Sequence, residues 1–303
     1  MPAGGAPEKE QALLPPTPPA RLGATDRICL AFVAALAALA LARHPHPAAL
    51  VACLAALAGG IVASARLGGR APAGDLVHDF FPVVTIIALF NLTGPVIAAA
   101  NPSRWDASFA ALDERLFGTL PAAWMGLLGR PWWLTDAASG AYVSYYFIPV
   151  VMGAALLAAR REEEFRDFAF TVAAALLVTF ASYFLMPTTG PRVPVEREAQ
   201  VLGGSALSAG VRAFLRLAEG NQLDAFPSGH TTLSLVFLAC GWRLFPRWRL
   251  PLALVVAGIV FSTVYLSLHY LIDVVAGAAL AALLPLVLPW LRRAAEPRQR
   301  PSS

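Results

Sequence analysis

Charged side chains are scarce in this sequence of 303 residues, of which 14% are charged and 57% are hydrophobic. A soluble domain carries about 25% charged residues, so the composition excludes an ordinary soluble domain, a disordered chain and a collagen-like fibre. Lysine is nearly absent, because Lys9 is the only lysine among 23 basic residues, and the net charge of +4 includes no basic run. Nucleic acid is therefore not an expected partner.

Cysteine is also rare. Cys29, Cys53 and Cys240 each lie within an apolar run, and no pair of them has CxxC spacing. Such an odd number without that spacing argues against a disulfide framework and against a thiolate metal site. We therefore expect no structural metal and no cofactor.

Long apolar segments dominate what is present. A helix that spans a bilayer needs about 20 mostly apolar residues. Two weaker candidates are residues 28–42 and residues 227–245, and the latter include His230 and Arg243. Five stronger candidates contain no acidic or basic side chain: residues 47–65, 80–100, 138–159, 168–186 and 250–268.

The apolar run at residues 250–291 is too long for one span, because a single helix of that length would extend about 63 Å. The chain must therefore turn back once within it. Ser267, His269 and Asp273 are its polar interruption. We place the turn there, which brings the number of spans to eight.

The fold class that follows is all-α, a polytopic membrane bundle of about eight transmembrane helices. Most basic residues fall on the side of the N-terminus, so the positive-inside rule places both termini in the cytoplasm of a bacterial-type plasma membrane. A cleaved signal peptide ending near Ala42 is the alternative for the first span. We divide the chain into a disordered N-terminus (1–27), three spans (28–100), an outer interfacial segment (101–137), a helical core (138–293) and a cytoplasmic tail (294–303).

The outer interfacial segment is rich in tryptophan. Its apolar residues recur every three to four positions, which predicts an amphipathic helix lying at the membrane surface. An aromatic belt and a lid that gathers lipid are both compatible with this pattern. The tryptophans are Trp105, Trp124, Trp132 and Trp133, and the periodic residues are Phe109, Leu112, Leu116 and Leu120.

Asp273 is the only acidic residue inside a predicted span. A buried aspartate costs about 3 kcal/mol on insertion scales, and such residues face a partner or a cavity. His269 lies four positions earlier, so both side chains share one face of a helix. A carboxylate at that spacing can orient an imidazole and stabilise its cation, as nucleophilic and general-base histidines require. A proton relay or a packing pair is the alternative.

The segment Pro227-Ser228-Gly229-His230 begins the sixth predicted span. Proline and serine are helix-start signals, and Gly229 allows a ligand to approach the backbone closely. Free amide N–H groups and the helix dipole make such a terminus an anion site. His230 therefore stands where a phosphate would bind, although a helix cap with an incidental histidine has the same pattern.

Gly190-Pro191-Arg192 follows the fifth predicted span, and its guanidinium could bind phosphate oxygens in a bidentate manner. Alone, this segment is equally compatible with a loop that carries a surface arginine. Under the predicted topology all three clusters lie on the outer face. Two histidines and one aspartate could also bind a metal ion, but no further histidine or acidic residue joins them, so we expect none.

Pro227-Ser228-Gly229-His230, followed by His269 and Asp273, resembles the type 2 phosphatidic acid phosphatase superfamily over residues 105–291. The resemblance implies a six-helix core that cleaves phosphoesters without metal, through a phosphohistidine. It implies that His269 is the nucleophile, that Asp273 orients it, and that His230 protonates the leaving oxygen. The phosphate-binding positions that it implies are Arg192, Ser228 and Gly229.

Departures from the superfamily pattern remove two cations. The usual lysine before Arg192 is replaced by Leu185, the proline after it by Val193, and the Ser-Arg pair before the second histidine by Ser262-Thr263. These features and the His269-Tyr270-x2-Asp273 string resemble instead the inositol phosphorylceramide synthase branch, whose members transfer a phosphoryl head group between lipids. Further similarities are Asp113-x2-Leu116-Phe117-Gly118 and the possible substrate-lining residues Tyr142, Tyr145, Tyr146 and Tyr270.

We therefore expect a phosphotransferase whose partners are a lipid phosphoester and a lipid alcohol. Because two phosphate-binding cations are missing, a doubly charged phosphomonoester is harder to bind than a singly charged phosphodiester. Arg197, Arg212 or Arg216 could replace the missing cations. The first alternative is a phosphatase acting on a lipid phosphate or a polyprenyl diphosphate. The second is a proton-coupled transporter, which the absence of an evident inverted repeat disfavours.

Overall fold

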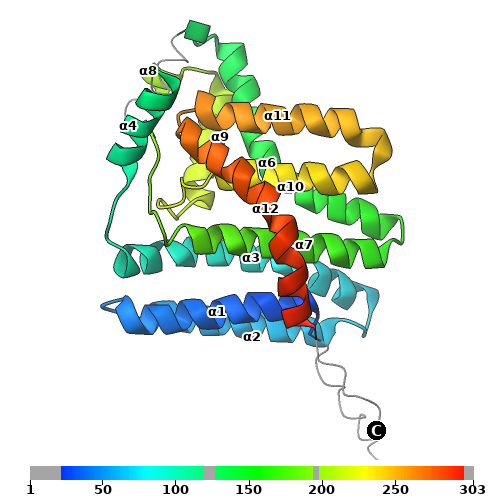
Figure 1. The fold of residues 1–303 in the computed structure, drawn as a ribbon. Coiled ribbons are helices and arrows are strands. Elements are labelled where there is room, and N and C mark those ends of the chain that lie inside the picture. The colour runs from blue at the N-terminus through cyan, green and yellow to red at the C-terminus, as the bar shows by residue number, and fades with distance from the viewer. Residues whose placement is uncertain (1–21, 119–126, 194–197, 297–303) are drawn as a thin grey trace, which may run out of the picture.

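The computed structural model describes residues 22–118, 127–193 and 198–296, and in these ranges the chain is helical and contains no strand (Figure 1). The all-α prediction is confirmed. Most of the N-terminal segment predicted to be disordered, together with Leu120, Trp124 and Arg197, lies outside the described residues. The first helix begins at Ala24, so the last residues of that N-terminal segment are helical.

Within the described residues, seven helices are long and apolar enough to cross a membrane, which agrees with a polytopic bundle. The sixth predicted span is α10 (Gly229–Leu244), whose 16 residues extend about 24 Å, less than the roughly 30 Å hydrocarbon core. The prediction of about eight transmembrane helices agrees with these seven together with the shorter α10. The seven are α1 (Ala24–Arg43), α2 (Ala48–Leu67), α3 (Pro72–Ala100), α6 (Trp132–Ala158), α7 (Glu162–Ser182), α11 (Arg249–Tyr265, with the 3-10 turn Pro246–Trp248 before it) and α12 (Leu271–Ala295).

The turn predicted within the long C-terminal apolar run is present between Tyr265 and Leu271. Ser267 has a φ of 56°, which reverses the chain direction. The Thr263 carbonyl accepts the N–H groups of Leu268 (3.0 Å) and His269 (3.1 Å). The end of α11 therefore holds the residues that precede α12 in a defined conformation.

The helices pack as two adjoining groups (Figure 1). Helices α1, α2 and α3 pack on one another, and α1 and α3 also pack on α7, while α6, α10 and α11 form the other group beside α7. Helix α12 crosses obliquely from α10 past α7 to the start of α1, where Arg27 Nη1 donates to the Ala295 carbonyl (3.0 Å). The beginning of the first helix and the end of the last one therefore lie at the same end of the bundle.

The interfacial prediction for residues 101–137 is corrected at the end of the segment. Its helical part is α4 (Asp106–Phe117), in which Phe109 is buried and stacks on Phe226 with a centroid distance of 4.4 Å, whereas Leu116 is exposed. Helix α4 therefore packs beside α12 through Phe109 and keeps an apolar side chain exposed, so its position at the membrane surface stays a prediction. The end of the segment belongs to α6, which begins at Trp132.

Two helices in the segment 187–226 were not predicted. They are α8 (Glu198–Leu202) and α9 (Ala206–Ala218), and Val211 and Leu215 bury the apolar side of α9. In Figure 1 they lie with α4 at the end of the bundle opposite to the end of α12. These short helices cover the region where α10 and α12 begin.

Candidate active site

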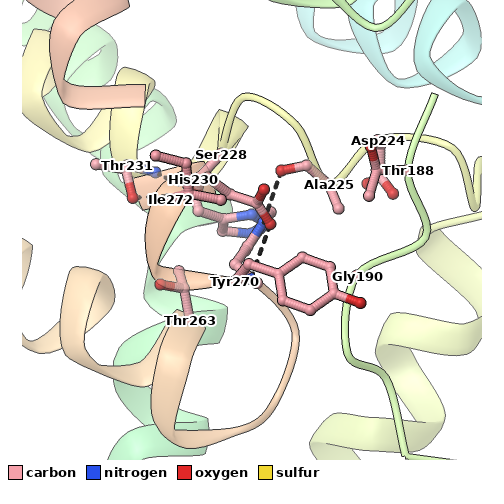
Figure 2. A network of polar contacts seen from close by, with 12 residues as sticks. Thr188, Gly190, Asp224, Ala225, Ser228, His230, Thr231, Thr263, Tyr270 and Ile272 are labelled. Atoms are coloured by element: carbon pink, nitrogen blue, oxygen red, sulfur yellow. Dashed lines mark hydrogen bonds and ion pairs between the residues drawn. The ribbon is translucent and has the colours of Figure 1, made fainter. Parts of the chain in front are cut away.

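The two histidines singled out from the sequence lie together in the structure. His230 is in the first turn of α10, and His269 is in the turn that precedes α12. Their ring centroids are 6.2 Å apart, and both side chains are buried. Figure 2 shows Ser228 and His230 at the start of α10, with Ala225 and Tyr270 approaching from neighbouring turns.

His269 is held by a backbone carbonyl. Its Nδ1 is 2.9 Å from the Ala225 backbone oxygen. A carbonyl oxygen only accepts hydrogen bonds, so Nδ1 must carry the proton. In the neutral ring, Nε2 therefore has the free lone pair that a nucleophile needs.

Asp273 does not share a helix face with His269, contrary to the expectation from their spacing. Helix α12 begins at Leu271, so His269 precedes it, and the side chains approach through the capping turn instead. Asp273 Oδ2 accepts the Tyr270 N–H (2.8 Å) and lies 3.5 Å from His269 Nδ1. The carboxylate thus caps α12 and also places a negative charge beside the imidazole.

The start of α10 is joined to the start of α12. Ser228 is the N-cap residue, its Oγ accepts the Thr231 N–H (3.3 Å), and its own N–H donates to the Asp273 carbonyl (2.9 Å). A Cβ on Gly229 would lie 2.5 Å from the Tyr183 hydroxyl. The first amides of α10 have no acceptor within the helix, which is the arrangement that the predicted anion site requires.

The predicted tyrosine cluster surrounds His230. The Tyr142 and Tyr145 rings each lie 4.1 Å from the His230 ring, and the Tyr142 hydroxyl is 3.3 Å from Nδ1. Nε2 of His230 is buried and has no hydrogen-bond partner in the described part of the chain. Tyr146 is 6.0 Å away, whereas Tyr270 belongs to the cap of α12 and not to this cluster.

Arg192 lies near the histidines but already has two protein partners. Nη1 donates to Gln222 (2.6 Å) and Nη2 donates to Asp224 (2.7 Å), while Nε is buried with no described partner. Gln222 and Asp224 were not predicted as partners of Arg192, because they lie 30 and 32 residues after it in the chain. Arg212 and Arg216 line a cavity of about 270 Å³ together with Arg192.

Glu219 is a further acidic residue that the sequence did not single out. It is 6% exposed, and its Oε1 accepts hydrogen bonds from the hydroxyls of Tyr142 (3.2 Å) and Tyr146. Burial raises the pKa of the Glu219 carboxyl, Asp224 raises it further, and Arg192 and the two hydroxyls oppose this rise. The sequence feature that could have pointed to Glu219 is its position directly after the amphipathic helix α9.

Asp113 supports the start of α12 from a neighbouring helix, α4. It is fully buried, and its two oxygens accept the N–H groups of Leu271 (2.7 Å) and Ile272 (2.9 Å). These are the first two amides of α12, which lack acceptors within the helix. Burial raises the pKa of Asp113, and the two backbone donors oppose that effect.

Asp113→Ala is expected to lower the free energy of unfolding by about 1–3 kcal/mol, because two buried N–H groups lose their acceptor. The measurement is the thermal unfolding midpoint in detergent. Glu114→Ala, at the exposed neighbouring position, is the matched control and should change the midpoint little. Equal midpoints for both variants would contradict the role assigned to Asp113.

Comparison with known proteins identifies the family. The sequence profile described as the PAP2 superfamily matches residues 107–287, which is more than half of the chain. The chain belongs to the PAP2 superfamily. The match runs from α4 into α12 and contains both histidines, Asp273 and Arg192, so the resemblance to the type 2 phosphatidic acid phosphatase superfamily is confirmed. Membership supports an activity of the lipid phosphatase or phosphotransferase type on phosphoesters in a membrane.

One curated relative is similar at low identity. It is a PA-phosphatase related-family protein of Dictyostelium discoideum, 20% identical over 233 residues that cover 64% of this chain. The chain spans only 41% of the length of that relative. No solved structure matches.

Proposed function

We propose that this PAP2 superfamily member is an integral membrane phosphotransferase that moves a phosphoryl head group between lipids through a phosphohistidine. One observation carries the proposal. The Ala225 carbonyl leaves Nε2 of His269 with its lone pair, beside a second histidine whose own Nε2 is buried without a described partner. A nucleophile and an acid or base side by side are the minimum that covalent phosphoryl transfer requires.

In the first step, His269 Nε2 attacks phosphorus and the bond from phosphorus to the leaving oxygen breaks. The leaving oxygen takes the Nε2 proton of protonated His230. Asp273 stabilises the positive charge that develops on the His269 ring, 3.5 Å from its carboxylate. The amides at the start of α10 and Arg192 balance the charge on the nonbridging oxygens.

In the second step, the hydroxyl oxygen of an acceptor attacks phosphorus and the phosphorus–nitrogen bond breaks. The hydroxyl proton goes to Nε2 of His230, which restores its protonated form, while His269 returns to the neutral ring. An alcohol acceptor makes the protein a transferase, and water in the same place makes it a phosphatase.

The charges around the site favour a phosphodiester donor. Arg192 is partly neutralised by Asp224, and Glu219 lies nearby. Leu185, at the position of a superfamily cation, is 72% exposed, and the Thr263 hydroxyl bonds to Val260 within its own helix. A singly charged diester needs less compensation than a doubly charged monoester, which supports head-group transfer of the inositol phosphorylceramide synthase type.

We also propose that the site faces the outer side of a plasma-type membrane, with both termini in the cytoplasm. The basic residues near Ala24 and Ala295 support this orientation through the positive-inside rule. These helix ends meet at one end of the bundle, and the histidines lie near the start of α12, at its other end.

Product analysis tests the proposal. Purified full-length protein in detergent with EDTA is given a phospholipid labelled in its phosphate, with and without a long-chain alcohol. We expect a new labelled lipid that requires the alcohol. If the only labelled products are free phosphate or a phosphomonoester, in amounts that the alcohol does not change, the protein hydrolyses its substrate and the transferase proposal is wrong. A strict metal requirement would contradict the phosphohistidine mechanism.

A further inference from the structure

A chain of three hydrogen-bonded side chains runs away from the reacting face of His230. Nδ1 of His230 is 3.3 Å from the Tyr142 hydroxyl, and this hydroxyl donates to Glu219 Oε1 at 3.2 Å. All three side chains are at least nine-tenths buried. Glu219 comes from the end of α9 and Tyr142 from α6, so three separate elements build this arrangement.

The direction of the hydrogen bonds follows from the number of protons. A tyrosine hydroxyl has one proton, and in Tyr142 that proton is directed to Glu219. The Tyr142 oxygen is therefore left as an acceptor, so His230 must supply the proton of the Nδ1 contact. This selects the tautomer in which Nε2 exchanges protons on the reacting side.

A carboxylate at the end of this chain also acts on the charge of the ring. When His230 is protonated at both nitrogens, its Nδ1–H is polarised toward Tyr142, whose own O–H is polarised toward Glu219. Connected hydrogen bonds in a buried site strengthen one another. The chain therefore favours the cationic form of His230 that protonates a leaving oxygen.

We infer that Glu219, acting through the Tyr142 hydroxyl, is a positioning residue that sets the tautomer of His230 and stabilises its cation. The inference rests on the proposed function, in which His230 is the acid of the first step. Glu219 does not touch the reacting atoms in this role. Asp273 has the corresponding relation to His269, so each histidine has its own carboxylate.

Leaving-group dependence is the sharpest test. A p-nitrophenolate leaving group needs little protonation, whereas an alkoxide needs an acid. Full-length wild type, Glu219→Gln and Tyr142→Phe are assayed in detergent on a p-nitrophenyl phosphodiester of a long-chain alcohol and on the matching dialkyl phosphodiester. The rate of the first step is measured as the burst of p-nitrophenol and as single-turnover release of the alkyl alcohol.

We expect Glu219→Gln and Tyr142→Phe to lower the rate of the first step by about 10- to 100-fold with the alkyl leaving group and by less than about 3-fold with p-nitrophenolate. The larger loss is a part of the full effect of general-acid catalysis, because His230 itself is still present. Tyr146→Phe is the matched control, because this hydroxyl also bonds to Glu219 but does not contact His230 Nδ1. Its alkyl-to-aryl rate ratio should remain within about 3-fold of wild type. Both rates come from the same sample, so partial misfolding cancels in their ratio.

Equal losses on both substrates in Glu219→Gln and Tyr142→Phe would overturn the inference and leave the proposed function intact. A ratio that falls as far in Tyr146→Phe as in Tyr142→Phe would also overturn it. The proposed function fails separately, if wild type releases no p-nitrophenol or if His269→Ala releases it at the same rate.

Discussion

His269→Ala is expected to abolish covalent labelling of the protein and to lower turnover by about 10⁴-fold or more, the scale found when a catalytic nucleophile is removed. The reason is geometric: the Ala225 carbonyl holds the protonated Nδ1, so that Nε2 presents the lone pair to phosphorus. No other side chain occupies that position in the part of the chain that the structure describes. His230 does not substitute, because in the proposed mechanism it is the acid and base that the transfer also requires.

The measurement is transfer of label from a donor lipid carrying radioactive phosphate to the protein, quenched in alkaline detergent because phosphohistidine is labile in acid. His46→Ala is the matched control, since His46 is exposed between α1 and α2, and it should label like wild type. Persistent labelling in His269→Ala would contradict the assignment. A wild type that turns over without ever carrying label would contradict the covalent mechanism as a whole.

Gly190→Ala is expected to lower turnover by about 100-fold, the cost of displacing a catalytic group by about 1 Å. A Cβ at this position would lie 2.4 Å from the Leu268 carbonyl oxygen and 3.2 Å from the Ala225 Cβ. Leu268 immediately precedes His269, and Ala225 carries the oxygen that orients the His269 ring. The added methyl group would therefore force apart the two segments that position the nucleophile.

The left-handed backbone conformation of Gly190 would by itself make an alanine there unfavourable. A second glycine with the same conformation, Gly69, allows this backbone effect to be measured without the steric one. Gly190 has a φ of 77° and Gly69 a φ of 78°, but nothing lies within 4 Å of a Cβ built on Gly69. Gly69→Ala should therefore lose only about 1–2 kcal/mol of stability from the backbone and retain its turnover. Comparable activity losses in the two variants, measured on equal amounts of folded protein, would refute the steric argument.

Local pattern accounts for the backbone features around the candidate site that the sequence predicted correctly. Ser228 is an N-cap residue because its short side chain accepts a backbone N–H, a property that any helix start can use. The turn before α12 was located because Ser267, His269 and Asp273 interrupt a long apolar run. Both predictions depend on neighbours in the chain, so one sequence is enough.

Contacts between segments that are distant in the chain account for the features of the candidate site that were not predicted from the sequence. The acceptor of His269 is the backbone oxygen of Ala225, and a carbonyl has no signature in the sequence. Glu219 and Asp224 were indistinguishable from other loop acids until the fold buried them beside Tyr142 and Arg192. The expectation that His269 and Asp273 share one face of a helix was wrong, because α12 begins at Leu271, between the two residues.

The sequence by itself determined the helical membrane class and the approximate spans, and it singled out Pro227–His230, His269 and Asp273 as candidate reactive residues. Hydropathy and helix-start chemistry operate over a few consecutive residues, so they can be read without a fold. Only the tertiary structure decided that Nε2 of His269 is the free nitrogen and that Arg192 donates a hydrogen bond to Asp224. It also decided that Glu219 is connected to His230 through the Tyr142 hydroxyl. These are properties of side chains and carbonyls that meet only when α6, α9, α10 and α12 pack together.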